Sequence, residues 1–103
     1  MLVCEPFQGY PYPYLRYNFT KYGIEEQYNK AVAVIQCESS WRINPPHNGV
    51  SLGIAQFTAP TWKDFGTGKY EDINPYLQLS TLAKMWSLGL QRRWDCYVML
   101  FGN

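Results

Sequence analysis

A stripe of apolar residues with helical spacing, ending in a carboxylate, constrains the fold of this chain more than any other feature. The spacing i, i+4 and i+7 predicts an amphipathic helix over residues 24–38. Its apolar face consists of Ile24, Tyr28, Ala31 and Ile35, with Glu38 at the end. Glu25 and Glu26 would lie in the first turn, where the helix dipole favours negative charge. Glu38 occupies an unusual place for a carboxylate, because ionising an acid on an apolar face is costly.

Turn formers and capping residues divide the rest of the chain into short elements. Residues 39–58 contain Asn-Pro-Pro and Asn-Gly, which predict an irregular loop or a short β-hairpin. Beyond them, capping residues predict two helices. These are a short helix over residues 59–65 with Thr58 as its cap and a helix from Asn74-Pro75 to about Gly89. Residues 92–101 are expected to form a last short helix or a closing segment.

The first 20 residues differ in composition from the rest, because tyrosine and proline alternate from Tyr10 to Tyr14. Proline restrains the residue before it toward extended geometry, so we expect residues 1–20 to form an extended arm. Its tyrosines would either pack on the surface as a strap or form a strip that binds sugar or a partner. Residues 21–103 would then form one domain, which suits a chain of 103 residues.

Charge and cysteine content exclude several classes of protein. The net charge is +1, from 9 basic and 8 acidic residues, so the basic excess expected of a nucleic-acid-binding protein is missing. The sequence has no apolar run near the roughly 18 residues that a membrane span requires. Three cysteines in no zinc-binding pattern and a single histidine, His47, predict no metal site, and we expect no other cofactor.

The position of Glu38 leaves two interpretations open. Burial would raise the pKa of its carboxyl group and keep it protonated near neutral pH, as a proton donor to a leaving group requires. Alternatively, Glu38 forms a surface salt bridge with Arg42, four residues further along the helix. A nucleophilic pair of Cys37 and His47 is disfavoured, because Cys37 points about 100° away from Glu38 and no third residue would orient the pair.

The residues around and after Glu38 form a recognisable pattern. The segment Cys37-Glu38-Ser39-Ser40-Trp41 is followed by Ser-Leu-Gly-Ile-Ala-Gln-Phe over residues 51–57 and then by Thr-Trp. This order resembles the small soluble lytic transglycosylase domain of the lysozyme superfamily. In that family Glu-Ser at a helix end precedes Ser-x-Gly-x-x-Gln and a short helix that contains aromatic residues. The resemblance spans residues 24–97.

The resemblance implies a lysozyme-like α+β fold, predominantly helical, with a small β-hairpin or irregular wing at residues 44–56 forming one wall of a cleft. It implies cleavage of the β-1,4 bond between N-acetylmuramic acid and N-acetylglucosamine in peptidoglycan glycan strands. Glu38 would be the catalytic acid, and would then act as the base toward the 6-hydroxyl of the muramic acid ring. The residues implied to contact substrate are Ser39, Ser51, Gly53, Gln56 and Tyr97.

The number of carboxylates separates the possible reactions. Glycosidases normally use two carboxylates, but none of the acidic residues after Glu38 lies in a segment that obviously faces the cleft. A scheme with one carboxylate is therefore favoured, in which the substrate's N-acetyl group stabilises the reacting centre and a 1,6-anhydro product forms. A hydrolytic lysozyme or endolysin that positions water with Asp64 or Asp72 is one alternative. A non-catalytic glycan-binding or assembly module is the other.

Some secreted members of the superfamily have cysteines placed like Cys37 and Cys96, so the resemblance also implies a disulfide between them. Otherwise both are buried free thiols; Cys4 would stay free or pair between chains. A disulfide indicates an oxidising location, either secreted, periplasmic or associated with the cell wall. The N-terminus lacks the regions of a signal peptide, so we expect a protein that is cytosolic at synthesis, trimmed at its N-terminus or released by another route such as phage lysis.

The low net charge suggests that wall targeting depends on a further domain or assembly. The chain is also short after Tyr97 for this family. The cleft is therefore expected to be open at one end or completed by a second chain.

Overall fold

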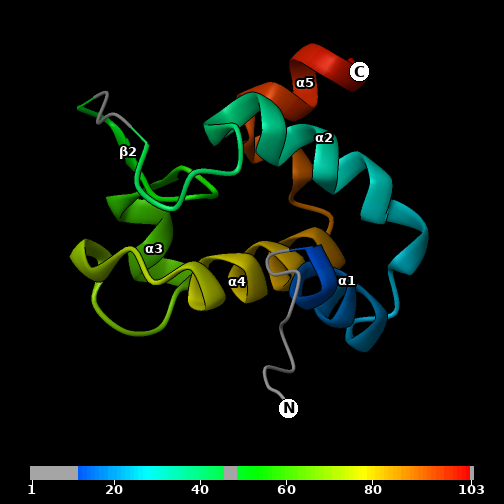
Figure 1. Ribbon diagram of the computed structural model, residues 1–103, viewed down its shortest axis with the longest axis horizontal. Coiled ribbons are helices and arrows are strands. Elements are labelled where there is room, and N and C mark those ends of the chain that lie inside the picture. Colours follow the sequence, from blue (N-terminus) through cyan, green and yellow to red (C-terminus); the bar gives the residue numbers. More distant parts are fainter. Residues whose placement is uncertain (1–11, 46–48, 103) are drawn as a thin grey trace.

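The computed structural model describes residues 12–45 and 49–102, and this part of the chain is predominantly helical with one small antiparallel sheet (Figure 1). The five α-helices are α1 (Tyr12–Lys21), α2 (Tyr28–Ser39), α3 (Ala59–Phe65), α4 (Pro75–Ser87) and α5 (Asp95–Phe101). The 3-10 turns are η1 (Glu25–Gln27), η2 (Tyr70–Asp72) and η3 (Gln91–Arg93). The strands are β2 (Ser51–Leu52) and β3 (Phe57–Thr58).

The helix α2 lies between α5 on one side and α1 on the other, and α1 also packs against α4 (Figure 1). The β-hairpin and α3 lie beyond the C-terminal end of α2 (Figure 1). Strand β2 pairs with β3 so that Ser51 faces Thr58 and Leu52 faces Phe57. No helix in the described part of the chain has the length and apolar character needed to cross a membrane.

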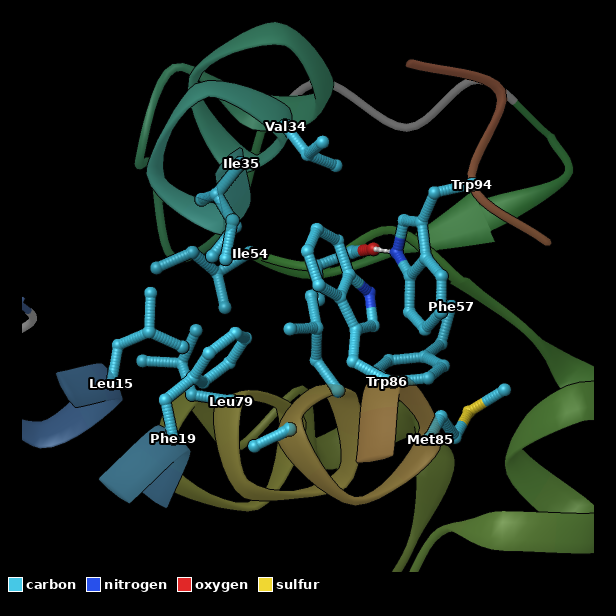
Figure 2. Close-up of a cluster of buried hydrophobic side chains, with 14 of the residues drawn as sticks. Leu15, Phe19, Val34, Ile35, Ile54, Phe57, Leu79, Met85, Trp86 and Trp94 are labelled. Atoms are coloured by element: carbon cyan, nitrogen blue, oxygen red, sulfur yellow. Dashed lines mark hydrogen bonds between the residues drawn. The ribbon is translucent and has the colours of Figure 1, made fainter. Parts of the chain in front are cut away.

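One apolar core joins α1, α2, α4 and the hairpin (Figure 2). Trp86 of α4 is its largest fully buried side chain and contacts the rings of Phe19, Trp94 and Tyr97. Ile54, in the turn between the two strands, is completely buried in the same core. The turn is therefore part of the hydrophobic core rather than an exposed connection.

Two of the predicted helices begin where their capping residues indicated. Thr58 accepts a hydrogen bond from the N–H of Thr61 at the start of α3, and Asn74 accepts one from Leu77 at the start of α4. The predicted last helix is η3 followed by α5. The helix predicted over residues 24–38 is also present, but its first residues form the 3-10 turn η1 and the α-helix begins at Tyr28.

The extended arm predicted for residues 1–20 is wrong where the structure describes it, because residues 12–20 are part of α1. Pro13 lies in the first turn of this helix, where a missing N–H has no helical partner to lose. Leu15 and Phe19, four residues apart, are completely buried, so core packing outweighs the extended preference of the Tyr-Pro repeat. The first 11 residues lie outside the described part of the chain.

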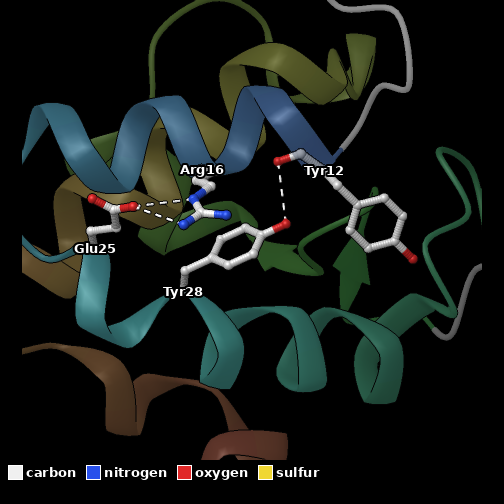
Figure 3. Close-up of polar contacts among 4 residues, drawn as sticks. All are labelled: Tyr12, Arg16, Glu25 and Tyr28. Carbon is white, nitrogen blue, oxygen red and sulfur yellow. Dashed lines mark hydrogen bonds and ion pairs between the residues drawn. The ribbon is translucent and has the colours of Figure 1, made fainter.

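Contacts of Arg16 and Tyr28 join α1 to η1 and to the start of α2 (Figure 3). Arg16 forms an ion pair with Glu25 at 3.0 Å, and its guanidinium lies 5.5 Å from the centre of the Tyr28 ring. The Tyr28 hydroxyl donates to the Tyr12 carbonyl at 3.5 Å. Both partners of the ion pair are about half exposed, so this pair contributes less than the buried contacts of α1.

The hairpin predicted as one possibility for residues 39–58 is confirmed, but its turn lies at residues 53–56 rather than at Asn48-Gly49. Gly53 and Gln56 have the positive φ angles, +86° and 53°, that reverse the chain there. The paired strands therefore span residues 51–58, slightly later than the wing expected at residues 44–56.

Candidate functional site

The carboxyl group of Glu38 lies in the last turn of α2 and is partly buried. Its Oε2 accepts a hydrogen bond of 3.3 Å from the main-chain N–H of Cys96, in the first turn of α5. That N–H has no partner within its own helix, so the carboxyl group satisfies it. Among the described residues, Glu38 forms no ion pair.

The surroundings of Glu38 favour its protonated form. Burial raises the pKa of the Glu38 carboxyl, the Cys96 N–H opposes that rise, and the negative charge of Asp95 adds to it. The net effect is a pKa above the ordinary value of a glutamate. The C-terminal end of α2 is the negative end of a helix dipole, which also disfavours a carboxylate there.

The predicted disulfide between Cys37 and Cys96 is confirmed, with an S–S distance of 2.06 Å. It joins the residue immediately before Glu38 to the residue whose N–H binds Glu38. Because Cys37 is disulfide-bonded, it is not a free nucleophile in this structure. Its proposed partner, His47, lies outside the described residues.

The alternative salt bridge between Glu38 and Arg42 is not formed in the structure. The reason is the end of α2 at Ser39: Ser40 and Trp41 both have left-handed backbones, with φ angles of 53° and 64°. The chain therefore leaves the helix before Arg42, which does not follow Glu38 on the same helical face. Trp41 instead packs against the ring of Tyr12, with ring centres 4.3 Å apart.

Ser39, implied to contact substrate, is buried inside the protein. Only 5% of its surface is exposed, and its hydroxyl donates to the carbonyl of Ile54 at 2.7 Å. A second contact, 3.3 Å long, joins the same hydroxyl to the carbonyl of Ile35, one turn earlier in α2. Ser39 therefore connects the end of the helix that carries Glu38 to the hairpin turn.

Gly53 and Gln56 are also used within the hairpin turn. The Gln56 side-chain amide donates to the Gly53 carbonyl at 2.8 Å, which closes the turn. A Cβ at Gly53 would lie 2.2 Å from the side-chain nitrogen of Gln78. Gly53 therefore allows its backbone to approach Gln78 closely. The family resemblance had implied a close approach to substrate instead.

Gln78 of α4 is a central residue that none of the sequence motifs included. It is 1% exposed, its carbonyl oxygen accepts from the Ala55 N–H at 2.9 Å, and its amide nitrogen donates to the Leu52 carbonyl at 3.1 Å. The Trp94 indole N–H donates to the Ala55 carbonyl at 2.8 Å (Figure 2). The turn is thus bound by side chains from α2, from α4 and from the residue before α5.

The remaining predicted residues lie in varied surroundings. Ser51 is partly buried in β2. The Tyr97 ring packs between Trp86 and Phe101, with ring centres at 5.4 and 5.3 Å. No hydrogen bond joins Tyr97 to Glu38 in the described structure.

The candidate second carboxylates do not share one environment. Asp64 and Asp72 are exposed on α3 and η2, and neither is among the groups that shift the pKa of Glu38. Asp95, beside Cys96, is the acidic residue whose charge acts on Glu38.

The structure thus brings together a partly buried acid, a main-chain donor and a hairpin turn held in the core. A carboxyl group in these surroundings can deliver a proton to a bound oxygen atom and take one back. Ser39 contacts the same turn that follows Ser51, whereas Tyr97 is directed into an aromatic cluster.

Comparison of the chain with protein-family models, with curated proteins and with solved structures gave no match.

Proposed function

We propose that this protein cleaves the β-1,4 bond between N-acetylmuramic acid and N-acetylglucosamine in peptidoglycan, as a lytic transglycosylase with a lysozyme-like fold. The observation that carries the proposal is Glu38 itself. It is a partly buried acid without an ionic partner among the described residues, its pKa is raised by burial, and it stands at a helix end beside a hairpin. That arrangement agrees with the Glu-Ser and Ser-x-Gly-x-x-Gln motifs of the sequence.

In the proposed reaction Glu38 acts first as an acid and then as a base. The protonated carboxyl group gives its proton to the glycosidic oxygen while the bond from that oxygen to C1 of the muramic acid breaks. The substrate's N-acetyl group stabilises the electron-deficient C1. The 6-hydroxyl of the same ring then bonds to C1, and its proton returns to the Glu38 carboxylate. The product is a 1,6-anhydro ring, and the enzyme is restored.

The N–H of Cys96 has a defined part in this cycle. A hydrogen bond to an ionised carboxylate is stronger than one to the neutral acid. The 3.3 Å contact in the structure would therefore shorten after Glu38 has lost its proton. It stabilises the carboxylate at the stage when that group must accept a proton from the sugar.

A binding module without turnover is the second candidate, and a specific observation favours it. Ser39, Gly53 and Gln56 make contacts within the protein that the fold itself needs. Their presence in the sequence is therefore explained without any reaction. The case for an enzyme consequently depends on Glu38, which has no comparable structural requirement to be an acid, since a glutamine oxygen could accept the same hydrogen bond.

Mass spectrometry of the soluble products from purified peptidoglycan tests the proposal. Glu38→Gln should lower the rate of product release by about 10²–10⁴-fold, the usual contribution of a general acid. Glu26→Gln, the same change at an exposed carboxylate of η1, is the matched control and should leave the rate unchanged.

The chemical form of the products separates the remaining possibilities. Anhydromuropeptides from the unmodified protein support the transglycosylase. Muropeptides with a reducing end would instead indicate a hydrolytic lysozyme. Glycan binding by both proteins with no product from either would indicate the binding module.

A further inference from the structure

We propose that Cys96 is the positioning residue for Glu38 and that its disulfide to Cys37 makes this positioning sensitive to reduction. The inference rests on the proposed function only where activity is measured. The carboxyl group of Glu38 holds its position because the disulfide joins α5 to α2.

One covalent bond and one hydrogen bond between these helices involve consecutive residues of α2 and a single residue of α5. Cys37 and Glu38 are neighbours in α2, and both are attached to Cys96, one through sulfur and one through the main-chain N–H. The Cα atoms of the two cysteines are 5.9 Å apart. Movement of Cys96 away from α2 would break the hydrogen bond to Glu38, and the disulfide opposes that movement.

The rest of α5 has few other attachments to the body of the protein. Cys96 is its only buried residue, and Tyr97 packs on Trp86. Val98, Met99, Leu100 and Phe101 are 38–75% exposed. Trp94, by contrast, is 4% exposed and bound to Ala55, so the chain is fixed up to the residue before α5. Opening the disulfide would leave α5 attached through Trp94 and held in place by the Tyr97 ring on Trp86 and by Lys30 of α2, whose ammonium lies 6.0 Å from the Tyr97 ring centre and 5.2 Å from that of Phe101.

The two cysteine residues differ in their exposure. Cys37 is exposed and Cys96 is 8% exposed. A thiolate of a small dithiol can therefore attack the sulfur of Cys37, form a mixed disulfide with it and release Cys96 as a thiolate. The second thiol of the reagent then displaces Cys37 and closes the reagent into its own disulfide. Two electrons pass to the protein, and both cysteines take up protons to become thiols.

Release of α5 should also change the pKa of Glu38. Three causes set the pKa of Glu38: burial, which raises it most, the Cys96 N–H, which lowers it, and the Asp95 charge, which raises it. The last two belong to α5, and because α5 packs against α2, its release also reduces the burial. The net effect is a rise, and weakening all three returns the pKa toward the ordinary value of a glutamate. The pH above which Glu38 loses the proton that the proposed reaction needs would then be lower.

The test compares the oxidised and dithiol-reduced forms of a Cys4→Ser protein, in which Cys37 and Cys96 are the only cysteines. NMR of carboxyl-labelled glutamate gives the pKa of Glu38 directly, without any need for activity. We expect a lower pKa in the reduced form, and a similar value in the Cys37→Ser/Cys96→Ser protein whether or not the dithiol is added. An unchanged pKa on reduction would overturn the proposal.

Hydrogen exchange separates local release from unfolding. Amides of residues 96–101 should exchange faster after reduction, while those of the buried α4 residues Leu82 and Ala83 keep their protection. Joint loss of protection in α4 and α5 would mean that the whole chain unfolds, and local release would be wrong.

Peptidoglycan cleavage by the Cys4→Ser protein should fall about 10- to 100-fold on reduction, the range that a misplaced catalytic group can cost. Its high-pH limit should move to lower pH at the same time. If the oxidised protein cleaves no peptidoglycan, the proposed function fails, but the NMR result still decides whether Cys96 positions Glu38.

Discussion

Glu38 accepts its hydrogen bond from the N–H of Cys96, a residue 58 positions away in the sequence, and the same Cys96 is disulfide-bonded to the neighbour of Glu38. The carboxyl group is thus held by two parts of the chain that meet only in the folded protein. This differs from a surface carboxylate, whose position depends on its own helix and on solvent. The contact explains how an acid at the end of α2 stays partly buried with no cation paired to it among the residues that the structure describes.

Replacing Glu38 by glutamine should make the protein at least as stable as the parent at pH 7. Because burial raises the pKa of Glu38 in the folded protein, the folded state binds its proton more tightly than the unfolded chain does. The contribution of Glu38 to the free energy of unfolding is therefore fully present below the pKa that Glu38 has in the unfolded chain. It is lost as the pH rises through the pKa of Glu38 in the folded protein. Glutamine has no proton to lose, so its advantage should disappear below about pH 4.

Thermal unfolding of both proteins between acidic and neutral pH measures this difference. Glu26→Gln, at an exposed carboxylate, serves as the control. A Glu38→Gln protein that melts below the parent at pH 7, and not at acidic pH, would contradict the raised pKa.

Gly53→Ala should destabilise the protein more than Gly49→Ala. The two glycines have nearly the same backbone angle, with φ of +86° and +84°, so alanine should be strained equally at both. At Gly53, however, the new Cβ would lie 2.2 Å from the Gln78 side chain, whereas at Gly49 no described atom would lie within 4 Å of it. We expect about 1–2 kcal/mol for the strain at each site and a further ~1–3 kcal/mol for overpacking at Gly53.

Urea denaturation gives the free energies of unfolding for the two glycine variants and the parent. Equal losses at the two positions would mean that Gln78 moves aside at no cost. The side chain of Gln78 would then not be firmly held by the hairpin turn.

Gln78→Leu should cost about 2–4 kcal/mol of stability. The change keeps most of the volume but removes the partners of the Ala55 N–H and the Leu52 carbonyl, and a polar group buried without a partner costs about 1–3 kcal/mol. Gln36→Leu, at an exposed position of α2, should change the free energy of unfolding by less than about 0.5 kcal/mol. Similar effects of the two substitutions in chemical denaturation would show that water replaces Gln78 at the turn.

Trp94→Phe should cost more stability than Trp86→Phe, although Trp86 is the more deeply buried ring. Both changes remove the same atoms, but the Trp94 N–H donates to the Ala55 carbonyl whereas the buried Trp86 N–H has no acceptor in the described structure. The expected difference is about 1–3 kcal/mol, the cost of leaving a buried carbonyl unpaired. Calorimetry of the two variants measures it, and the reverse order would show that ring packing outweighs the hydrogen bond.

Local signals in the sequence predicted most of the helix boundaries. Thr58 and Asn74 cap α3 and α4 because their side-chain oxygens accept from nearby N–H groups, and such contacts depend on a few adjacent residues. The apolar period before Glu38 likewise placed α2 and its half-buried acid. The helix α1 was missed because the Tyr-Pro pattern is a local signal for extended chain, while the burial of Leu15 and Phe19 depends on α4.

The roles of the motif residues could not be predicted from local patterns. Ser39 and Gly53 make their contacts with Ile54 and Gln78, which lie 15 and 25 residues further along the chain. One signal was nevertheless present for Gln78. It shares the helical spacing of Leu82 and Met85, and a polar residue on an apolar helix face indicates a buried hydrogen-bonding partner.

The hairpin turn also determines when the chain can finish folding. Its Ala55 N–H is bound by a residue 23 positions later, and its Ala55 carbonyl by one 39 positions later. During synthesis from the N-terminus, the turn therefore emerges long before Gln78 and Trp94 exist to satisfy it. The helices α1 and α2 can contact each other early, but the hairpin must wait for nearly the whole sequence. A nascent chain released before Trp94 would retain helical segments and lack an ordered hairpin beside Glu38.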